Sequence, residues 1–317
     1  MTMRIAFQMD PMEEVDINAD TTFALAEEAS FRGYELYEYS PEHLIYNEGL
    51  VQARARKMHI NRNGKEHVTF EERKLINLAL DVDVVWMRQD PPFDMSYITA
   101  THLLERLCAH TLVVNDPKWV RACPEKILPL DFPQLMPETV ITRDRLSIDK
   151  FRSKHKDIIL KPLYGNGGAG VFLVKEGDSN YSALIEMFME NSREPLIAQA
   201  FLKDVEKGDK RIIIIDGEPV GAINRIPQKG EMRSNMHVGG LATSTDLTAS
   251  DLYICEAIGP MLKDRGQILV GIDVIGDKMT EINITSPTGV QELKEFTGID
   301  AAALAWDAIE RKLGNKT

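Results

Sequence analysis

The sequence predicts a fold of the α/β class whose later part is of the α+β type, and two observations lead to it. Over the first third of the chain, strand-like and helix-like segments alternate, as they do in open, largely parallel sheets covered by helices. Over the rest, pairs of strand-like segments joined by short turns predominate, which is typical of antiparallel hairpins. The 317 residues allow two or three domains, because one domain commonly takes roughly 100–200 residues.

The alternation in the first third can be followed segment by segment. Residues 4–8 are predicted to form a strand, residues 21–32 a helix and residues 34–39 a second strand. The polar segment 49–67 is predicted to be a ribbon or a loop. The other elements expected here are a strand at 82–87, a helix at 97–110 and a short strand at 111–114.

The pattern changes near residue 122, where helical or loop segments lead to residue 156 and hairpins follow. The expected strands are 157–163, 171–175, 196–200, 211–215 and 220–226, with a further hairpin over 268–285. The expected helices are 181–191, 250–264 and 301–313.

The charge balance excludes two classes of partner. The chain has 37 Lys and Arg against 49 Asp and Glu, a formal net charge of -12, whereas binding to nucleic acid or an anionic membrane needs a basic surface.

The cysteines Cys108, Cys123 and Cys255 are scattered without a CxxC pair, which supports neither a disulfide framework nor a structural zinc site. The apolar stretch at residues 5–7 is too short for a signal peptide or a membrane span, so we expect a cytoplasmic protein.

A glycine cluster at residues 165–170 matches the GxGxxG pattern. In dinucleotide-binding folds a helix follows these glycines, whereas here the strand-like Val-Phe-Leu-Val of residues 171–174 follows. The cluster therefore joins two strands, and its backbone N–H groups can point at a phosphate. Lys161 on the incoming strand favours phosphate binding, because a lysine in an apolar run is costly unless it faces an anion. The alternative is a hairpin turn that uses glycine only for positive φ.

The hairpin over residues 271–285 carries a second polar group. Glu281 and Asn283 are two residues apart on one strand, so their side chains leave the same face. With a turn at residues 276–278, Asp273 lies opposite Glu281 on that face. Two carboxylates and an amide suit Mg²⁺ that is also held by substrate phosphates. The alternative is a solvated polar face of an edge hairpin.

Basic residues gather in the same two thirds of this acidic chain, namely Lys126, Lys161, Lys210, Arg211, Arg225 and Arg233. Arg211 and Arg225 begin and end a predicted hairpin, so they can lie side by side and clamp a carboxylate or a phosphate. Residues 226–240 lack a helical or strand period and have glycines near both ends, which is typical of a mobile lid. Plain disorder is the alternative. The sequence offers no Ser/His/Asp or Cys/His arrangement for nucleophilic catalysis.

Several motifs, read in order, resemble those of one family. They are MRQDPPFD at 87–94, EK at 125–126, IILKPL at 158–163 before the glycine cluster, GDKR at 208–211, RIP at 225–227 and TEINITSPTG at 280–289. The series resembles bacterial glutathione synthetases, of the ATP-grasp superfamily, over nearly the whole chain. The first and last motifs together are the specific ones.

The resemblance implies an ATP-grasp fold of three domains. These are a Rossmann-like substrate-binding domain at 1–122, a central lid domain at 123–200 and a C-terminal catalytic domain at 201–317, with ATP between the last two. The implied ATP contacts are Lys126, Lys161, Gly165, Gly167, Gly168, Gln199, Ala200, Phe201, Leu202 and Asp209. The implied ligands of Mg²⁺, or of Mn²⁺ in its place, are Asp273, Glu281 and Asn283.

The resemblance also implies which residues face the substrates. Arg211, Arg225 and Arg233 would face the acyl phosphate or substrate carboxylates. The peptide site would be shaped by Arg88, Asp90, Ser286, Pro287, Thr288 and Gly289.

The implied reaction joins γ-glutamylcysteine to glycine and forms glutathione, ADP and phosphate. ATP converts a carboxylate into an acyl phosphate, which the amine attacks, while Mg²⁺ and cationic side chains neutralise the phosphoryl group. The family also implies a homotetramer with only small-molecule partners.

The sequence departs from the family pattern at two positions. Leu241 stands where a basic residue is expected to close the mobile loop, and Tyr164 stands where some relatives have an acidic residue. Two other functions stay open at this point. One is another ATP-grasp ligase, such as one that adds D-alanine or glutamate, and the other is a non-catalytic nucleotide-binding protein on the same scaffold.

Overall fold

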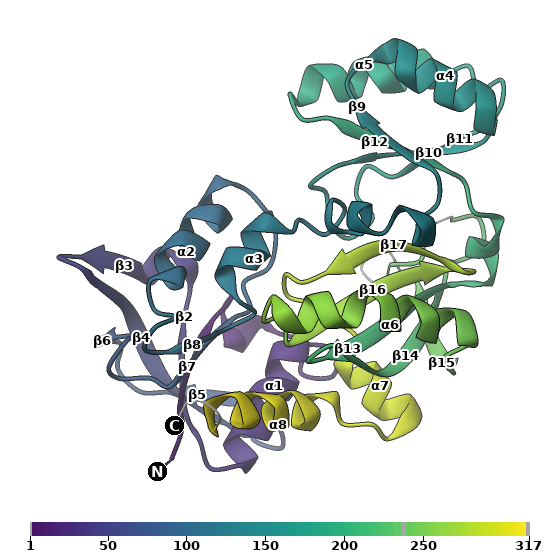
Figure 1. Cartoon of the computed structure of the whole chain (residues 1–317). Coiled ribbons are helices and arrows are strands. Elements are labelled where there is room, and N and C mark those ends of the chain that lie inside the picture. Colours follow the sequence, from purple (N-terminus) through teal and green to yellow (C-terminus); the bar gives the residue numbers. More distant parts are fainter. Residues whose placement is uncertain (1, 232, 236–238, 315–317) are drawn as a thin grey trace.

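The computed structural model describes residues 2–231, 233–235 and 239–314, and in these residues the strands form three sheets that follow one another along the chain. The first sheet has eight strands, the second four and the third five. Figure 1 shows the second sheet standing above the third, with the first sheet to one side. The predicted α/β class is confirmed by this mixture of sheets and covering helices.

The first sheet confirms the alternation predicted for the first third of the chain. Its parallel part runs in the order β2 (Glu35–Tyr39), β1 (Arg4–Gln8), β7 (Val84–Met87) and β8 (Leu112–Val114). Its antiparallel part consists of β3 (Leu44–Asn47), β4 (Leu50–Ile60), β5 (Val68–Phe70) and β6 (Lys74–Asn77). The segment 49–67 is therefore mostly a long strand of a ribbon.

Aspartate caps begin the two long helices of this part. Asp20 accepts a hydrogen bond from the backbone N–H of Phe23 and begins α1 (Thr21–Phe31). Asp94 does the same for α2 (Met95–Glu105), which ends five residues earlier than predicted. A short helix, α3 (Pro117–Ala122), leads to the second sheet.

The second sheet has the strand order β11 (Phe172–Val174), β10 (Ile158–Pro162), β12 (Leu196–Ala200) and β9 (Thr139–Thr142). Strands β10 and β11 are antiparallel on either side of the glycine cluster, as predicted. Helices α4 (Arg145–His155) and α5 (Tyr181–Asn191) cover its outer face (Figure 1). The sequence predicted α5, but it did not predict β9 as a strand.

The third sheet is antiparallel, in the order β15 (Leu241–Thr245), β14 (Glu218–Ile226), β13 (Asp209–Ile215), β16 (Leu269–Ile275) and β17 (Lys278–Asn283). Both predicted hairpins are present, and β15 was not predicted. The last helices are α6 (Ala249–Asp264), α7 (Val290–Thr297) and α8 (Ala301–Gly314). Short 3₁₀ helices are η1 (Met12–Glu14), η2 (Pro41–His43), η3 (Leu128–Asp131), η4 (Pro133–Leu135) and η5 (Lys203–Lys207).

The side chain of Asn115 fixes the first sheet to the third. Its Oδ1 atom accepts hydrogen bonds from the backbone N–H groups of Ile268 and Leu269, at 2.8 and 3.0 Å. Its Nδ2 atom donates to the carbonyl groups of Leu269 and Ile284, at 2.8 and 2.9 Å. An amide whose donors and acceptor are all used in a buried place holds its neighbours in one geometry.

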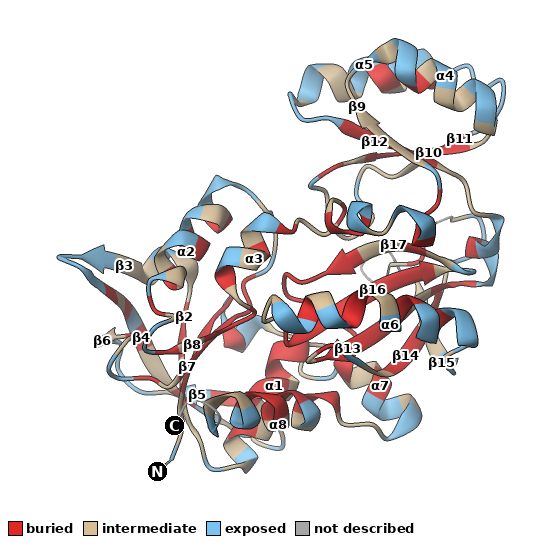
Figure 2. Cartoon of the chain, viewed as in Figure 1, coloured by how far each residue is buried: buried red, intermediate tan, exposed pale blue. Residues whose placement is uncertain are grey.

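Helix α8 returns to the N-terminal part and completes its core. Trp306 is fully buried, and its ring meets Trp86 edge to face at a centroid distance of 5.0 Å. Its Nε1 atom donates a 2.8 Å hydrogen bond to the carbonyl of Leu25 in α1. Figure 2 shows the parallel strands β1, β7 and β8 and much of α1 in the colour of buried residues. The hydrophobic core of the first sheet thus draws on both ends of the chain.

The predicted domain limits at residues 122 and 200 stay a prediction, although the three sheets span 4–114, 139–200 and 209–283. Within the described residues, no helix combines the length and the apolar character that crossing a membrane requires.

We predict that Trp306→Ala lowers the free energy of unfolding by about 3–5 kcal/mol, because it leaves a large cavity in this core and removes the hydrogen bond to Leu25. Leu304→Ala on the same helix is the control, since Leu304 is exposed and its loss should cost much less. Urea denaturation of both variants measures the difference. Equal losses would show that α8 does not complete this core.

Candidate active site

A cavity lies between the second and third sheets. The ten residues predicted to contact ATP all line it, namely Lys126, Lys161, Gly165, Gly167, Gly168, Gln199, Ala200, Phe201, Leu202 and Asp209. Asp273, Glu281 and Arg233 line it as well. Residues far apart in the sequence therefore converge on one cavity.

The glycine cluster forms one wall of this cavity, and at least two of its glycines stand where a side chain would not fit. Gly168 has a φ of +79°, and a Cβ atom there would lie 2.7 Å from Oδ1 of Asn235. A Cβ atom on Gly165 would lie 2.5 Å from the ring of Pro162. The backbone of the cluster is thus left accessible from the cavity, as the phosphate-binding interpretation requires.

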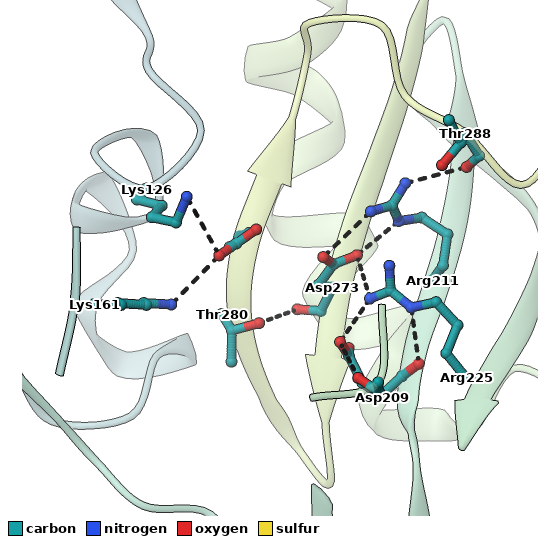
Figure 3. Close-up of polar contacts among 10 residues, drawn as sticks. Lys126, Lys161, Asp209, Arg211, Arg225, Asp273, Thr280 and Thr288 are labelled. Carbon is teal, nitrogen blue, oxygen red and sulfur yellow. Dashed lines mark hydrogen bonds and ion pairs between the residues drawn. The ribbon is translucent and has the colours of Figure 1, made fainter. Parts of the chain in front are cut away.

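Two buried lysines meet one carboxylate in the cavity. The Nζ atoms of Lys161 and Lys126 lie 3.4 and 3.7 Å from Oε1 of Glu281, and Figure 3 shows both lysines pointing into this space. Burial lowers the pKa of Lys161, and Glu281 partly offsets this effect. Burial alone would raise the pKa of Glu281, but the two lysines keep it below its ordinary value. The carboxylate stays ionised because the lysines are next to it.

Two arginines meet a second carboxylate nearby (Figure 3). Asp273 accepts from Nε of Arg211 at 2.6 Å and pairs with Arg225 at 3.0 Å. Despite complete burial, these arginines hold the pKa of Asp273 far below its ordinary value. Arg225 also donates to Asp209 at 2.6 Å, yet burial raises the pKa of Asp209 to about 6. Arg211 and Arg225 thus lie side by side, as predicted, with Asp273 between them.

Strand register brings the two carboxylates together. Asp273 pairs directly with Glu281 across β16 and β17, as predicted. The predicted turn at 276–278 is wrong by one residue, because β17 begins at Lys278 and the turn is only Gly276 and Asp277. A bulge after Asp273 restores the predicted register.

The third predicted metal ligand lies at the end of the same strand. Asn283 pairs with Gly271, is nearly buried and does not line the cavity. Its Nδ2 atom has no hydrogen-bond partner among the described residues. In the described part of the chain, no three His, Cys, Asp or Glu residues form a group that could hold a metal ion. A cation here would need oxygen atoms from Asn283 or from the substrate in addition to the two carboxylates.

Lys210 was grouped with the cleft residues, and this prediction is wrong. Its Nζ atom contacts Asp251 in α6 and not the cavity. Side chains alternate along a strand, so the residue between Asp209 and Arg211 points to the opposite face of β13.

The predicted lid lies over the glycine cluster where it is described. Arg233 donates to Glu231 at 2.7 Å and, more weakly, to the carbonyl of Gly168 at 3.4 Å. Ser234 donates to Asp209 at 3.0 Å. Residues 232 and 236–238 of the predicted lid lie outside the described residues. Leu241 begins β15, and its side chain is mostly exposed. A leucine there cannot supply the positive charge that the family pattern places at this position.

The predicted peptide-site residues gather beside the cavity rather than in it. Arg88 is buried, donates to Thr22 at 3.0 Å and reaches the carbonyl of Pro287 at 3.2 Å. Ser286 donates to Asp90 at 2.9 Å.

The same segment ends against the arginine cluster. The carbonyl of Thr288 accepts a 3.1 Å hydrogen bond from Arg211. A Cβ atom on Gly289 would lie 3.4 Å from Cγ of Arg211, so this glycine packs directly on the arginine side chain. The residues predicted to shape the peptide site therefore adjoin those predicted to face the acyl phosphate.

Sequence reasoning missed several residues of the site. Ser234, Asn235 and Thr280 line the large cavity, and Glu125 lies beside it. Ser234 and Asn235 belong to a segment without regular period, so no pattern placed them. Glu125 was part of a quoted motif, next to Lys126, but received no role.

Solved structures with the same fold define the class of protein. A D-cycloserine synthetase has a TM-score of 0.69 at 14% identity, with 98% of this chain and 99% of that one covered. A D-alanine–D-alanine ligase from Bacillus anthracis has a TM-score of 0.62 at 14% identity, with 100% of both chains covered. The fold, with a cavity between two antiparallel sheets, is of the ATP-grasp type, as the match of residues 125–298 to an ATP-grasp domain model shows.

Comparison with known sequences narrows the class to one family. Models of the prokaryotic glutathione synthetase N-terminal domain and ATP-grasp domain match residues 3–121 and 125–298. Glutathione synthetase of Brucella melitensis is 56% identical over 312 residues, which cover 98% of this chain and 100% of the relative. That of Vibrio vulnificus is 42% identical over 313 residues, covering 98% of each. The chain belongs to the prokaryotic glutathione synthetase family.

We predict that Asp273→Asn lowers the free energy of unfolding by about 3–5 kcal/mol, because two buried guanidinium groups lose their shared anion. Asp83→Asn is the matched control, since its pair with Arg4 is more than one third exposed and should contribute less than about 1 kcal/mol. Urea denaturation compares them. A loss at Asp273 no larger than at Asp83 would contradict the pairing described here.

Proposed function

We propose that this site performs the reaction of its family. The chain is an ATP-dependent ligase that joins γ-glutamylcysteine to glycine, with ADP and phosphate as the other products. One observation carries the assignment of the site. The glycine cluster and two buried lysines, which suit phosphates, share a single cavity with the carboxylates Asp273 and Glu281, which suit a cation.

The proposed nucleotide contacts follow the lining of the cavity. Lys126, Lys161 and the backbone of the glycine cluster bind the phosphates of ATP. The backbone at 199–202 contacts the adenine at the end of β12, and Asp209 binds the nucleotide from β13. Lys161, Gln199 and Ala200 belong to the second sheet and Asp209 to the third, so the nucleotide would join the two sheets.

The residues also fit Mg²⁺, or Mn²⁺ in its place. Asp273 and Glu281 would hold it with the amide oxygen of Asn283, whose Nδ2 atom has no partner among the described residues to hold the amide in its present orientation. When bound, the ion neutralises charge on the transferring phosphoryl group. The phosphates of ATP would complete its oxygen ligands.

The chemistry proceeds in two steps. The cysteinyl carboxylate of γ-glutamylcysteine attacks the γ-phosphorus of ATP, and the bond to ADP breaks. The glycine amine then attacks the acyl carbon, and phosphate leaves as the amide bond forms. Arg211, Arg225 and Arg233 supply fixed positive charge where the phosphoryl oxygens and carboxylates lie. The lid over the glycine cluster excludes water, which would hydrolyse the acyl phosphate.

The remaining assignments extend the same proposal. Arg88, Asp90 and the segment 286–289 bind γ-glutamylcysteine beside the cavity. The three domains have limits at residues 122 and 200, and the protein is a cytoplasmic homotetramer. These assignments are supported by the family resemblance of the motifs.

We predict that the purified protein releases phosphate from ATP when Mg²⁺, γ-glutamylcysteine and glycine are all present. Replacing the two substrates by D-alanine should give only background release, although a D-alanine–D-alanine ligase has the same fold. Absence of release with the first pair would refute the proposed function.

A second prediction concerns the carboxylate that pairs with both lysines. Glu281→Gln should retain the fold but lower kcat at least about 100-fold, because it removes a negative ligand of the cation while keeping the shape. Glu186→Gln, at an exposed position on α5, is the matched control and should leave kcat unchanged. Circular dichroism checks the fold, and a Glu281→Gln rate equal to the control would remove Glu281 from the metal site.

A further inference from the structure

A second, smaller cavity adjoins the nucleotide cavity and has no role in the site described so far. The two cavities share Lys126, Gly165 and Asn166 as lining residues. The other walls come from Pro91 and Phe93 of the first part of the chain and from Thr285 after β17. The cavity thus lies where all three parts of the chain meet, next to the place where the phosphates are proposed to bind.

Two aromatic rings close one side of this cavity. Phe93 and Tyr164 are stacked, with an interplanar angle of 29° and a centroid distance of 6.2 Å. Tyr164 immediately precedes the glycine cluster, and Phe93 belongs to the MRxDPPFD motif. The stack restricts the cavity on that side, which favours a small occupant. The departure noted at Tyr164 therefore has a structural role in this chain.

Glu125 is the one carboxylate among the residues that line this second cavity. The hydroxyl of Thr285 donates a hydrogen bond to its Oε1 atom. Its backbone carbonyl accepts a 3.0 Å hydrogen bond from the N–H of Ile282 in β17. The side chain and the backbone of Glu125 are thus both held against the strand that carries Glu281.

We propose that this second cavity binds the acceptor amino acid, and that Glu125 accepts a proton from its ammonium group. The inference rests on the proposed function, because it assigns the amine of that reaction. An ammonium group cannot attack until it loses a proton. Once Glu125 has taken that proton, the nitrogen lone pair forms the bond to the acyl carbon. The bond from that carbon to the phosphate oxygen breaks at the same time, and the departing phosphate can take the second proton of the nitrogen.

The surroundings of Glu125 suit this role near neutral pH. Burial raises its pKa to about 7, while the Thr285 hydrogen bond and the charges of Lys126 and Arg211 lower it. Glu281 in β17 raises it further, and Tyr97 in α2 also faces it. A base must be deprotonated to act, so kcat/KM for glycine should rise with pH through this range.

Glu125→Gln tests the proposal, because it keeps the shape of the side chain and removes its basicity. We expect kcat/KM for glycine to fall at least about 100-fold and its rise near pH 7 to disappear. Label exchange between bridging and non-bridging oxygens of ATP, measured with γ-glutamylcysteine but without glycine, should continue, because that step uses no amine. Glu125→Asp should restore part of the rate together with the rise.

Thr285→Val gives an independent measurement. Removing the hydrogen bond that lowers the pKa of Glu125 should move the rise in kcat/KM to higher pH. The proposal is overturned if Glu125→Gln keeps wild-type kcat/KM for glycine, or if it loses label exchange and glycine use to the same extent. If instead the wild-type protein forms no product from γ-glutamylcysteine and glycine, the proposed function fails, and not this inference alone.

Discussion

The pairing of two buried lysines with one glutamate is the constraint on which the site depends. Lys161 comes from the second sheet, Lys126 from the segment before it and Glu281 from the third sheet. An unpaired buried charge costs several kcal/mol, so the two sheets have to keep this contact while no other anion is present. The contact therefore holds the two sheets together at the cavity, where phosphates are proposed to bind.

The same contact couples the proposed ligands to one another. When phosphates become the partners of the lysines, Glu281 loses its cations and faces further negative charge, unless a cation arrives with the nucleotide. Asp273 differs from Glu281, because Arg211 and Arg225 stay paired with it and continue to balance its negative charge. Glu281 thus exchanges its cationic partners when the nucleotide binds, whereas Asp273 keeps its two arginines and would take up the cation in addition to them. This difference explains why two adjacent acids can serve one site without repelling each other apart.

Patterns that repeat along a strand predicted most of the site, and irregular segments did not. The face shared by Glu281 and Asn283 follows from the alternation of side chains along a strand. The prediction for Lys210 was wrong because it overlooked the same alternation, which places Lys210 on the opposite face of β13. The ribbon strand β4 was expected only as a ribbon or loop because its exposed polar residues hide the strand pattern. Ser234, Asn235 and Glu125 reach the site through tertiary contacts, which no local pattern records. The roles of individual residues come from the family resemblance, and the geometry describes where those residues lie.

A crystal structure with Mg²⁺ and a non-hydrolysable ATP analogue tests the central claim most directly. We predict that the Nζ atoms of Lys126 and Lys161 leave Glu281 for phosphate oxygens. Glu281 then binds the metal together with Asp273 and Asn283. A complex in which both lysines stay on Glu281, with the phosphates bound elsewhere, would contradict this account.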